Sequence, residues 1–421
     1  MTPPIVHGLT VLPALYLHIP FCDSKCDYCD FFSQTKQDPG LQLSVIRQTL
    51  LQMDFFLQQL DPRGIDTVYI GGGTPNSLAP DVFEYLIEQV ADKVKPLRPK
   101  EWTVELNPER INGKQLALLE SAGVSRLSIG IQSFSENTLT FLGRKTTAER
   151  NFEALELIGR NWTGQWNMDL IISVPGENRD TAIEDAVTAM SFHPDHLSVY
   201  NLTIEPGTPL YTRLKRKEFT PPSSEDAADT LRRVWNLLKK RSFQHYEISN
   251  FSRPGCSSRH NLHYWRMHPY LGVGPGAVST LPSASDKSPV RITVTRDFNR
   301  FLDARFSTDD IIRAGADEIL SSREFLLEYL MMGLRTNPGI HLGEFFGIFQ
   351  KDLGEIIPQT IKKAVERKLL VLHEAQGTGT EHMYISPTEE GMMILDTILL
   401  WAAIELEDMD VEIRWPPRSM I

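Results

Sequence analysis

The sequence predicts an α/β fold, a partial (β/α)6 barrel followed by a mainly helical C-terminal domain. Between about residues 12 and 200, short apolar runs alternate with longer amphipathic stretches, which is typical of parallel strands joined by crossover helices. Right-handed crossovers curl six such units into an open barrel. Beyond residue 206 the alternation ends, and roughly the last hundred residues read mainly as helix.

Helical patterns of roughly crossover length lie between the predicted strands. The strands are expected at residues 15–19, 67–70, 103–106, 126–131, 168–172 and 197–202. The helices are expected at residues 41–60, 81–94, 113–122, 135–142, 148–159 and 179–192. Because functional groups of such barrels lie at the carboxyl ends of the strands, the residues just after each strand are the first candidates for a site.

The second half of the chain predicts fewer regular elements. A helix is expected from an N-cap at Ser224 to about Arg241, and a short hairpin around residues 369–372 and 383–385. The expected organisation is an N-terminal extension (1–12), a barrel (13–240), a connecting region (241–310) and a C-terminal helical domain (311–421).

Composition and charge describe a folded acidic protein. The 421 residues carry 43 Lys and Arg against 54 Asp and Glu, a formal net charge of −11, and 41% of them are hydrophobic. Nucleic acid is not an expected partner, because phosphate-binding faces carry a basic excess. The most apolar stretch, residues 392–404, is shorter than a membrane span of about 20 residues and contains Asp396. Without a signal-like start, the protein is expected in the cytoplasm.

Three of the four cysteines stand close together directly after the first predicted strand. Cys22, Cys26 and Cys29 have the spacing C-x3-C-x2-C. A structural zinc site needs four closed ligands, and no fourth Cys or suitably spaced His follows nearby. Three thiolates on one loop can instead each bind one iron of a [4Fe–4S] cluster and leave the fourth iron to a small-molecule ligand. The remaining alternative is three buried thiols that act as small hydrophobes.

This triplet, with the aromatic Tyr28 before the third cysteine, resembles the signature of the radical S-adenosylmethionine (SAM) superfamily. The segment from Gly71 to Pro75, Gly-Gly-Gly-Thr-Pro, is similar to the glycine-rich motif of that family, where missing side chains let the backbone approach a ligand. The resemblance implies that the open iron chelates the methionine moiety of SAM. One-electron reduction then cleaves the sulfonium to a 5′-deoxyadenosyl radical.

The same resemblance implies a set of SAM contacts, most of them at strand ends. They are Tyr16, Tyr28, Gly72, Gly73, Thr74, Glu105, Gln132, Arg144 and Asp169. Taken one by one, each polar member could equally be a hydrogen-bonded strand terminus.

Over nearly its whole length the chain resembles two related branches, the oxygen-independent coproporphyrinogen III dehydrogenases and the heme chaperones HemW. The dehydrogenases carry a fourth cysteine where this chain has Phe31, and His260-Asn-Leu-His-Tyr-Trp265 is similar to the H-N-x-x-Y-W heme motif of the chaperones. The resemblance therefore implies a heme chaperone with His260 as a heme ligand. It also implies transfer to an acceptor, such as a membrane respiratory protein, and a reductant such as flavodoxin or ferredoxin.

Several alternatives stay open at this point. The chain could decarboxylate coproporphyrinogen III, modify heme by radical chemistry, or use its cluster as a structural element or an oxygen sensor. His260 could be a hydrogen-bonded structural histidine. Cys256, four residues before it, could be a heme thiolate or an inert thiol.

Overall fold

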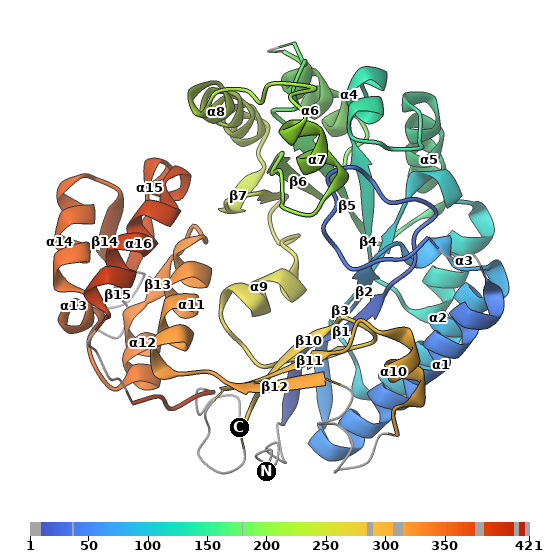
Figure 1. Cartoon of the computed structure of the whole chain (residues 1–421), viewed down its shortest axis with the longest axis horizontal. Coiled ribbons are helices and arrows are strands. Elements are labelled where there is room, and N and C mark those ends of the chain that lie inside the picture. The colour runs from blue at the N-terminus through green and yellow to red at the C-terminus, as the bar shows by residue number, and fades with distance from the viewer. Residues whose placement is uncertain are drawn as a thin grey trace.

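The computed structural model describes residues 10–35, 38–178, 180–283, 289–305, 315–374, 383–407 and 412–416. One curved sheet forms an open arc with helices along its outer side, and a lobe of C-terminal helices faces it across the opening (Figure 1). Helix α9 (Arg259–Trp265) lies between the two.

The six predicted parallel strands are present and lie side by side in chain order. They are β1 (Val11–Ile19), β2 (Gly64–Gly72), β3 (Glu101–Leu106), β4 (Arg126–Gln132), β5 (Gln165–Ile172) and β6 (His196–Asn201). The crossover helices are α1 (Pro39–Leu60), α2 (Pro80–Val94), α3 (Gly113–Ala122), α4 (Glu136–Phe141), α5 (Ala148–Asn161) and α6 (Thr181–Ser191). The predicted α/β class is therefore confirmed, with β1 starting four residues before the predicted strand.

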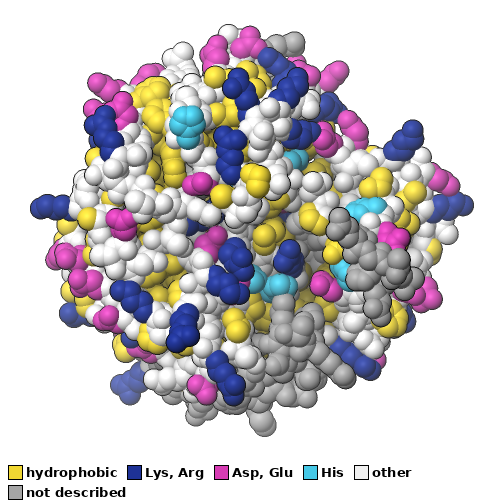
Figure 2. Space-filling view, turned by 180° about the vertical axis from the view of Figure 1, so that it is seen from behind, with side chains coloured by type: hydrophobic (Ala, Val, Ile, Leu, Met, Phe, Trp, Pro, Cys, Tyr) yellow, Lys and Arg dark blue, Asp and Glu magenta, His cyan; other side chains and the backbone are white. Residues whose placement is uncertain are grey.

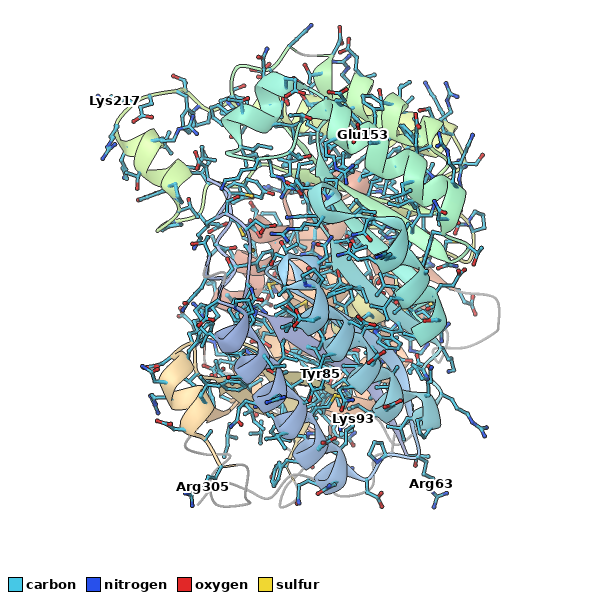
Figure 3. The ribbon with its side chains drawn as sticks, turned by 90° about the vertical axis from the view of Figure 1, so that its right-hand side faces the viewer. Arg63, Tyr85, Lys93, Glu153, Lys217 and Arg305 are labelled. Atoms are coloured by element: carbon cyan, nitrogen blue, oxygen red, sulfur yellow. The ribbon has the colours of Figure 1, made fainter. Side chains whose placement is uncertain are left out.

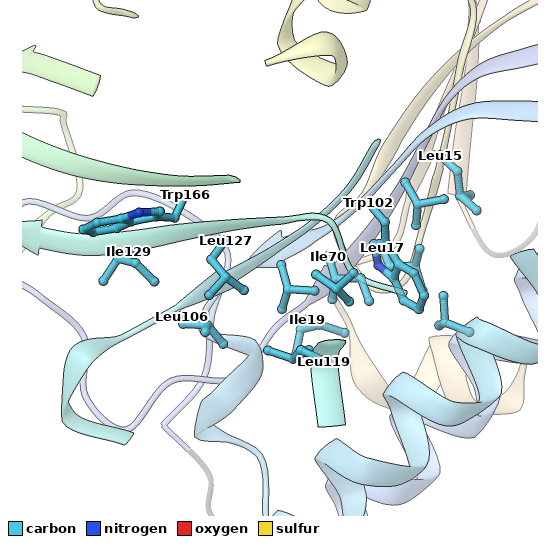
Figure 4. Packing of buried hydrophobic residues seen from close by; sticks show 14 of the residues in the cluster. Leu15, Leu17, Ile19, Ile70, Trp102, Leu106, Leu119, Leu127, Ile129 and Trp166 are labelled. Carbon is cyan, nitrogen blue, oxygen red and sulfur yellow. The ribbon is translucent and has the colours of Figure 1, made fainter. Parts of the chain in front are cut away.

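Side-chain alternation along the strands divides the sheet into two faces. On β1, Leu15, Leu17 and Ile19 are fully buried in the core between the sheet and the helices (Figure 4), together with Ile70 and Trp102 of the next two strands. Burying a side chain of this size contributes about 1.5–3 kcal/mol. The alternate residues of β1 point to the opposite, concave face of the sheet, which is where the candidate site lies.

The helices put their polar sides outward. Tyr85 and Lys93 of α2 and Glu153 of α5 lie on the outer layer (Figure 3). Acidic and basic side chains are interspersed on the face that Figure 2 shows, with neither sign forming a continuous patch. No helix among the described residues has both the length and the apolar character needed to cross a membrane.

The sheet is wider than six strands, because the predicted connecting region and the first strand after it add strands to both edges. β7 (Gln244–Glu247) and β8 (Asn250–Ser252) extend the β6 edge antiparallel. β9 (Tyr270–Val273) pairs parallel with β1, and β10 (Val278–Pro282), β11 (Pro289–Val294) and β12 (Gly315–Ile319) continue that edge. The predicted domain boundaries stay predictions, and the one at 310/311 falls outside the described residues.

The C-terminal lobe has its own core. Its elements are α11 (Ser322–Leu334), β13 (Ile340–His341), α12 (Leu342–Phe349), α13 (Leu353–Ile356), α14 (Pro358–Glu366), β14 (Leu370–Glu374), β15 (Met383–Pro387), α15 (Glu389–Met393) and α16 (Leu395–Glu405). β14 and β15 pair antiparallel, which confirms the predicted hairpin. The indole Nε1 of Trp415 donates a 2.8 Å hydrogen bond to the carbonyl of Met267 and ties the lobe to the segment after α9.

Three further α-helices lie in the described part of the chain: α7 (Pro209–Lys215), α8 (Ser224–Lys240) and α10 (Phe298–Asp303). The predicted N-cap of α8 at Ser224 is wrong by one residue. Ser223 caps the helix, because its hydroxyl accepts a 3.1 Å hydrogen bond from the Asp226 amide, the third helical residue.

Candidate functional site

The three cysteines lie on the loop that follows β1, and the rest of the protein ties this loop down. The amide of Cys22 donates to the carbonyl of Gln34 at 3.1 Å, so the two ends of the loop are bridged. The amide of Asp27 donates to the carbonyl of Leu142 at 3.0 Å, and the Asp27 carboxylate pairs with Arg213 at 2.7 Å. The thiols are therefore presented by a loop that is fixed at its ends and in its middle.

The surroundings of the thiols are partly buried. Burial raises the pKa of Cys22, and it raises the pKa of Cys29 to about 11. Nowhere in the described ranges do three His, Cys, Asp or Glu side chains converge on a single metal ion. A zinc ion requires such convergence, whereas a cubane cluster takes each thiolate on a different iron.

The glycine-rich end of β2 packs against the cysteine loop. A Cβ on Gly73 would lie 2.4 Å from the carbonyl oxygen of Phe21, and a Cβ on Gly72, whose φ is +108°, would lie 2.4 Å from Nδ1 of His18. A Cβ on Gly71 would meet the Glu105 carboxylate at 2.6 Å. Close packing against protein atoms therefore accounts for the glycines at these positions, and contact of Gly72 and Gly73 with a ligand stays a prediction.

Glu105, near the end of β3, is a buried carboxylate with two donors. Its Oε1 accepts a 2.6 Å hydrogen bond from the hydroxyl of Tyr69, and its Oε2 accepts one of 3.1 Å from the Gly72 amide. Burial nevertheless dominates and raises the pKa of Glu105 to about 7. The carboxyl group of Glu105 can therefore bind or release a proton near neutral pH.

Arg144 brings a buried positive charge next to the cysteine loop. Its side chain is 5% exposed, Nη2 donates to the Gly130 carbonyl at 2.9 Å, and Nη1 lies 3.6 Å from Sγ of Cys26. Glu109 is its carboxylate neighbour, at 3.6 Å. Among the described residues, Nε of Arg144 has no hydrogen-bonding partner. An unpaired buried donor of this kind is costly, so it favours an anionic ligand at this position.

The ends of β4 and β5 complete the polar lining. Gln132 has a φ of +69° at a bulge in β4, a conformation uncommon for residues other than glycine. Asp169 of β5 accepts hydrogen bonds from Asn167 at 2.8 Å and from Ser128 at 3.3 Å, while burial raises its pKa.

These residues line one cavity of about 460 Å³ on the concave face of the sheet, named the barrel cavity below. The predicted cluster and SAM residues on its wall are Cys22, Cys26, Tyr28, Cys29, Gly72, Gly73, Thr74, Glu105, Gln132, Arg144 and Asp169. The tertiary structure thus gathers eleven predicted residues from the cysteine loop, from four strands or the turns after them (β2 to β5), and from the segment between α4 and α5 that carries Arg144. Tyr16 and His260 are not on this wall.

Tyr16 lines a second cavity of about 420 Å³, named the side cavity, together with His18 and Phe31. Its hydroxyl lies 2.9 Å from Nδ1 of His18. Because Nε2 of His18 lies 2.8 Å from the carbonyl of Phe32, it must donate there, and Nδ1 accepts the proton of Tyr16. Both nitrogens of His18 are therefore engaged.

His260, the predicted heme ligand, is 1% exposed and lies between the two cavities. Its Nδ1 is 2.8 Å from the hydroxyl of Thr67, which itself donates to Pro13, so Nδ1 donates. Its Nε2 accepts from the hydroxyl of Tyr264 at 2.9 Å, and burial lowers its pKa to about 3. With both nitrogens engaged, heme ligation by His260 stays a prediction that requires one of these bonds to open.

The sequence prediction missed the deep end of the barrel cavity. Nδ1 of His196 lies 2.6 Å from Oδ1 of Asn167, and its Nε2 lies 2.7 Å from the hydroxyl of Tyr246. Arg126 lies 3.6 Å from Glu101 with both side chains almost fully buried. Arg126 and His196 are each the first residue of an otherwise largely apolar strand, and this position could have identified them as candidates from the sequence.

Cys256 lies outside both cavities. Its thiol is 3.5 Å from Nε2 of Gln165 and 3.9 Å from Asp195. These contacts fit the inert alternative for this cysteine.

Comparison with known families assigns two parts of the chain. Residues 16–188 match the radical SAM superfamily, and residues 320–394 match the HemN C-terminal domain. The first range contains the cysteine loop and β1 to β5, and the second contains most of the C-terminal lobe.

Among curated proteins, the chain is similar to two relatives over most of its length. It is 31% identical over 404 residues to "Radical S-adenosyl methionine domain-containing protein 1, mitochondrial" of Bos taurus, covering 94% of this chain and 88% of the relative. It is 30% identical over 390 residues to "Heme chaperone HemW" of Escherichia coli, covering 92% and 97%. The resemblance inferred from short motifs thus extends across whole proteins.

Among solved structures, coproporphyrinogen III oxidase (HemN) from Escherichia coli, titled a radical SAM enzyme, superimposes with a TM-score of 0.72. The match covers 93% of this chain and 90% of the oxidase at 17% identity. At this identity the match shows a shared fold, which confirms the predicted barrel with its C-terminal domain.

Proposed function

The chain belongs to the radical SAM superfamily, in the family of the heme chaperone HemW, and from this premise we propose that it binds heme and transfers it to an acceptor protein. The observation that carries the proposal is the whole-length similarity to a heme chaperone. The side cavity supports it, because a largely aromatic pocket lies next to the cysteine loop and shares Asp30 and Phe31 with the barrel cavity.

We propose that Cys22, Cys26 and Cys29 hold a [4Fe–4S] cluster and that SAM occupies the barrel cavity. The donor set fits: three thiols on one loop, a buried guanidinium at Arg144 whose Nε has no hydrogen-bonding partner among the described residues, and a buried carboxylate at Glu105. When bound, the cluster supplies one-electron chemistry to the sulfonium of SAM. The role of Arg144 is to bind the methionine carboxylate, and that of Glu105 is to bind its amino group.

Phe31 supports a chaperone over a decarboxylase. It stands where the dehydrogenase branch carries a fourth cysteine, and its side chain is 64% exposed at the boundary of the two cavities. An exposed aromatic ring beside an apolar pocket is suited to contact a large flat ligand.

The proposed function is tested with full-length, anaerobically reconstituted protein in two parallel assays. Hemin is titrated while the Soret band is recorded, and coproporphyrinogen III is incubated with SAM and dithionite while decarboxylated product is measured. A saturable Soret shift without product supports the chaperone. Multiple-turnover decarboxylation, or no Soret shift at all, contradicts it.

We also propose the partners of the protein and its location in the cell. A heme protein is the acceptor, with a membrane respiratory protein as the predicted type, and a flavodoxin or ferredoxin is the predicted reductant. The cytoplasm is the location that the sequence predicts, while one relative carries the name of a mitochondrial protein.

A further inference from the structure

The side cavity combines an apolar floor with a charged rim. Tyr264, Trp265 and Tyr270 line it from α9 and β9, while Met332 lines it from α11 of the C-terminal lobe. Arg296 is exposed at this cavity, and Arg291 lines it while paired to Glu328 at 2.6 Å. At about 420 Å³ the cavity falls within the ~300–1,000 Å³ typical of ligand pockets. Aromatic walls with cations at the edge suit a porphyrin with two propionates.

A chain of three hydrogen-bonded side chains ends at this cavity. The carboxylate Oδ2 of Asp66 lies 2.8 Å from Nε2 of His263, and Nδ1 of His263 lies 2.8 Å from Nδ1 of His268. Asp66 is held as an anion by Lys100 at 2.6 Å and Arg259 at 3.5 Å. Of these three residues His268 lines the cavity, and the other two lie behind it.

The charge of Asp66 dictates which nitrogens carry protons. A carboxylate only accepts, so Nε2 of His263 donates to Asp66. In a neutral imidazole the other nitrogen then holds a lone pair, so Nδ1 of His263 accepts and Nδ1 of His268 donates. Nε2 of His268 is left with a lone pair. Within the part of the chain that the structure describes, this nitrogen has no hydrogen-bonding partner.

This arrangement matches the requirement for an imidazole ligand to a metal. Such ligands bind through one nitrogen and donate the other N–H to a second group that fixes the tautomer and raises ligand basicity. His18 and His260 lack the open nitrogen, because both nitrogens of each ring are engaged.

We propose that His268 binds heme iron through Nε2 in the side cavity, with His263 and Asp66 as positioning residues. The proposal rests on the proposed function, since heme is the cargo, and it assigns iron ligation to a residue outside the H-N-x-x-Y-W motif. Helix α9 then serves as a wall between the two cavities, because Asn261 lines the barrel cavity and Tyr264 lines the side cavity. His260 holds Tyr264 in place through their hydrogen bond.

The test uses full-length protein at pH 8, where an ordinary imidazole with a pKa of about 6.5 is neutral. Hemin is titrated into the wild type, His268→Ala, His260→Ala and the control His373→Ala, whose residue is exposed on the C-terminal hairpin. The ferrous complexes are examined by resonance Raman spectroscopy for the iron–histidine stretching band. We expect His268→Ala to lose this band and to bind hemin at least about tenfold more weakly, as for lost metal-site contacts. The control is expected to match the wild type.

A second variant tests the positioning residues without removing the ligand. Asp66→Asn keeps the shape of the side chain but removes its charge, so the iron–histidine band is expected to move to lower frequency while the band itself persists. An unshifted band contradicts the role of Asp66. Loss of the band in His260→Ala but not in His268→Ala overturns the ligand assignment and leaves the proposed function intact. Absence of any Soret shift in the wild type overturns both.

Discussion

The barrel cavity and the side cavity are neighbours that differ in kind. The barrel cavity is lined by thiols, carboxylates and a buried guanidinium, whereas the side cavity is lined largely by aromatic rings. Tyr69 faces the first, Tyr264 faces the second, and the ring of His260 stacks on Tyr69 at 4.9 Å while bonding to Tyr264. The comparison teaches that one sheet can carry a charged cavity, the proposed cofactor site, and a more apolar cavity, the proposed cargo site, when a hydrogen-bonded wall separates them.

Removing the proposed cluster ligands is the largest perturbation and tests whether the cavities are independent. Replacing Cys22, Cys26 and Cys29 together by Ala is expected to abolish bound iron and sulfide, because no other thiol lines the barrel cavity. Hemin binding by the same variant is expected to persist, because none of the three cysteines lines the side cavity. Iron analysis and Soret titration measure the two results. Loss of both together would mean that the cavities form one site.

A substitution of Arg144 tests whether the charge in the barrel cavity contributes to SAM binding. Arg144→Gln removes the buried cation beside Cys26, so the affinity for SAM is expected to fall about 10–100-fold, the loss of a charge-assisted hydrogen bond of roughly 1.5–3 kcal/mol. Calorimetric titration of SAM into reconstituted protein measures it. Arg160→Gln is the matched control, because Arg160 makes an exposed pair with Glu156. Equal affinities for both variants would contradict the assigned role of Arg144.

The glycine at the end of β2 tests how the loop is held. Gly73→Ala forces a Cβ to within 2.4 Å of the Phe21 carbonyl, so the variant is expected to lose about 1–3 kcal/mol of unfolding free energy and to hold less iron per chain. Urea unfolding and iron analysis measure the two effects. Gly113→Ala, at a site with nothing within 4 Å of the added Cβ, is the control and is expected to unfold like the wild type.

The smallest expected effect is a pH dependence centred on Glu105. Its folded pKa of about 7 lies above its ordinary value of 4.5 because of burial, so its protonated form is the one that favours folding. Its contribution to the stability of the ligand-free protein is fully present below pH 4.5 and is lost as pH rises through about 7.

The affinity for SAM is expected to change with pH in the opposite direction to the stability, because the cationic SAM binds the ionised carboxylate of Glu105 better than the neutral one. Affinity for SAM is expected to rise roughly tenfold between pH 6 and pH 8 and to be nearly flat in Glu105→Gln. The same titration on both proteins at the two pH values checks this. A wild-type profile as flat as that of the variant would show that Glu105 does not bind the amino group.

Local patterns were sufficient for the barrel and for most of the site. The strands could be located because an apolar run of five or six residues between polar segments reports burial on its own. Cys22, Cys26 and Cys29 could be grouped because they share one loop. Glu105 and Asp169 could be predicted from the family resemblance, and their position near the ends of parallel strands agrees with it because such strands end at the same edge. Boundaries were less accurate, as the N-cap at Ser223 shows, because two adjacent serines have the same capping chemistry.

The remaining features of the fold and of the two cavities depend on contacts between residues that are far apart in the sequence. The sequence by itself determined the alternation of strands and helices, the cluster loop and the residues at the strand ends, because each depends on neighbours a few positions away. Only the tertiary structure showed that β9 pairs with β1 and that both ring nitrogens of His260 are hydrogen-bonded. It also showed that Asp66, His263 and His268 are linked by hydrogen bonds that leave Nε2 of His268 available to a ligand. The Nδ1 partner of His260 and the carboxylate partner of His263 lie almost two hundred residues away, and the paired residues of β1 and β9 lie about 250 residues apart. No periodicity or motif encodes a contact over such a separation.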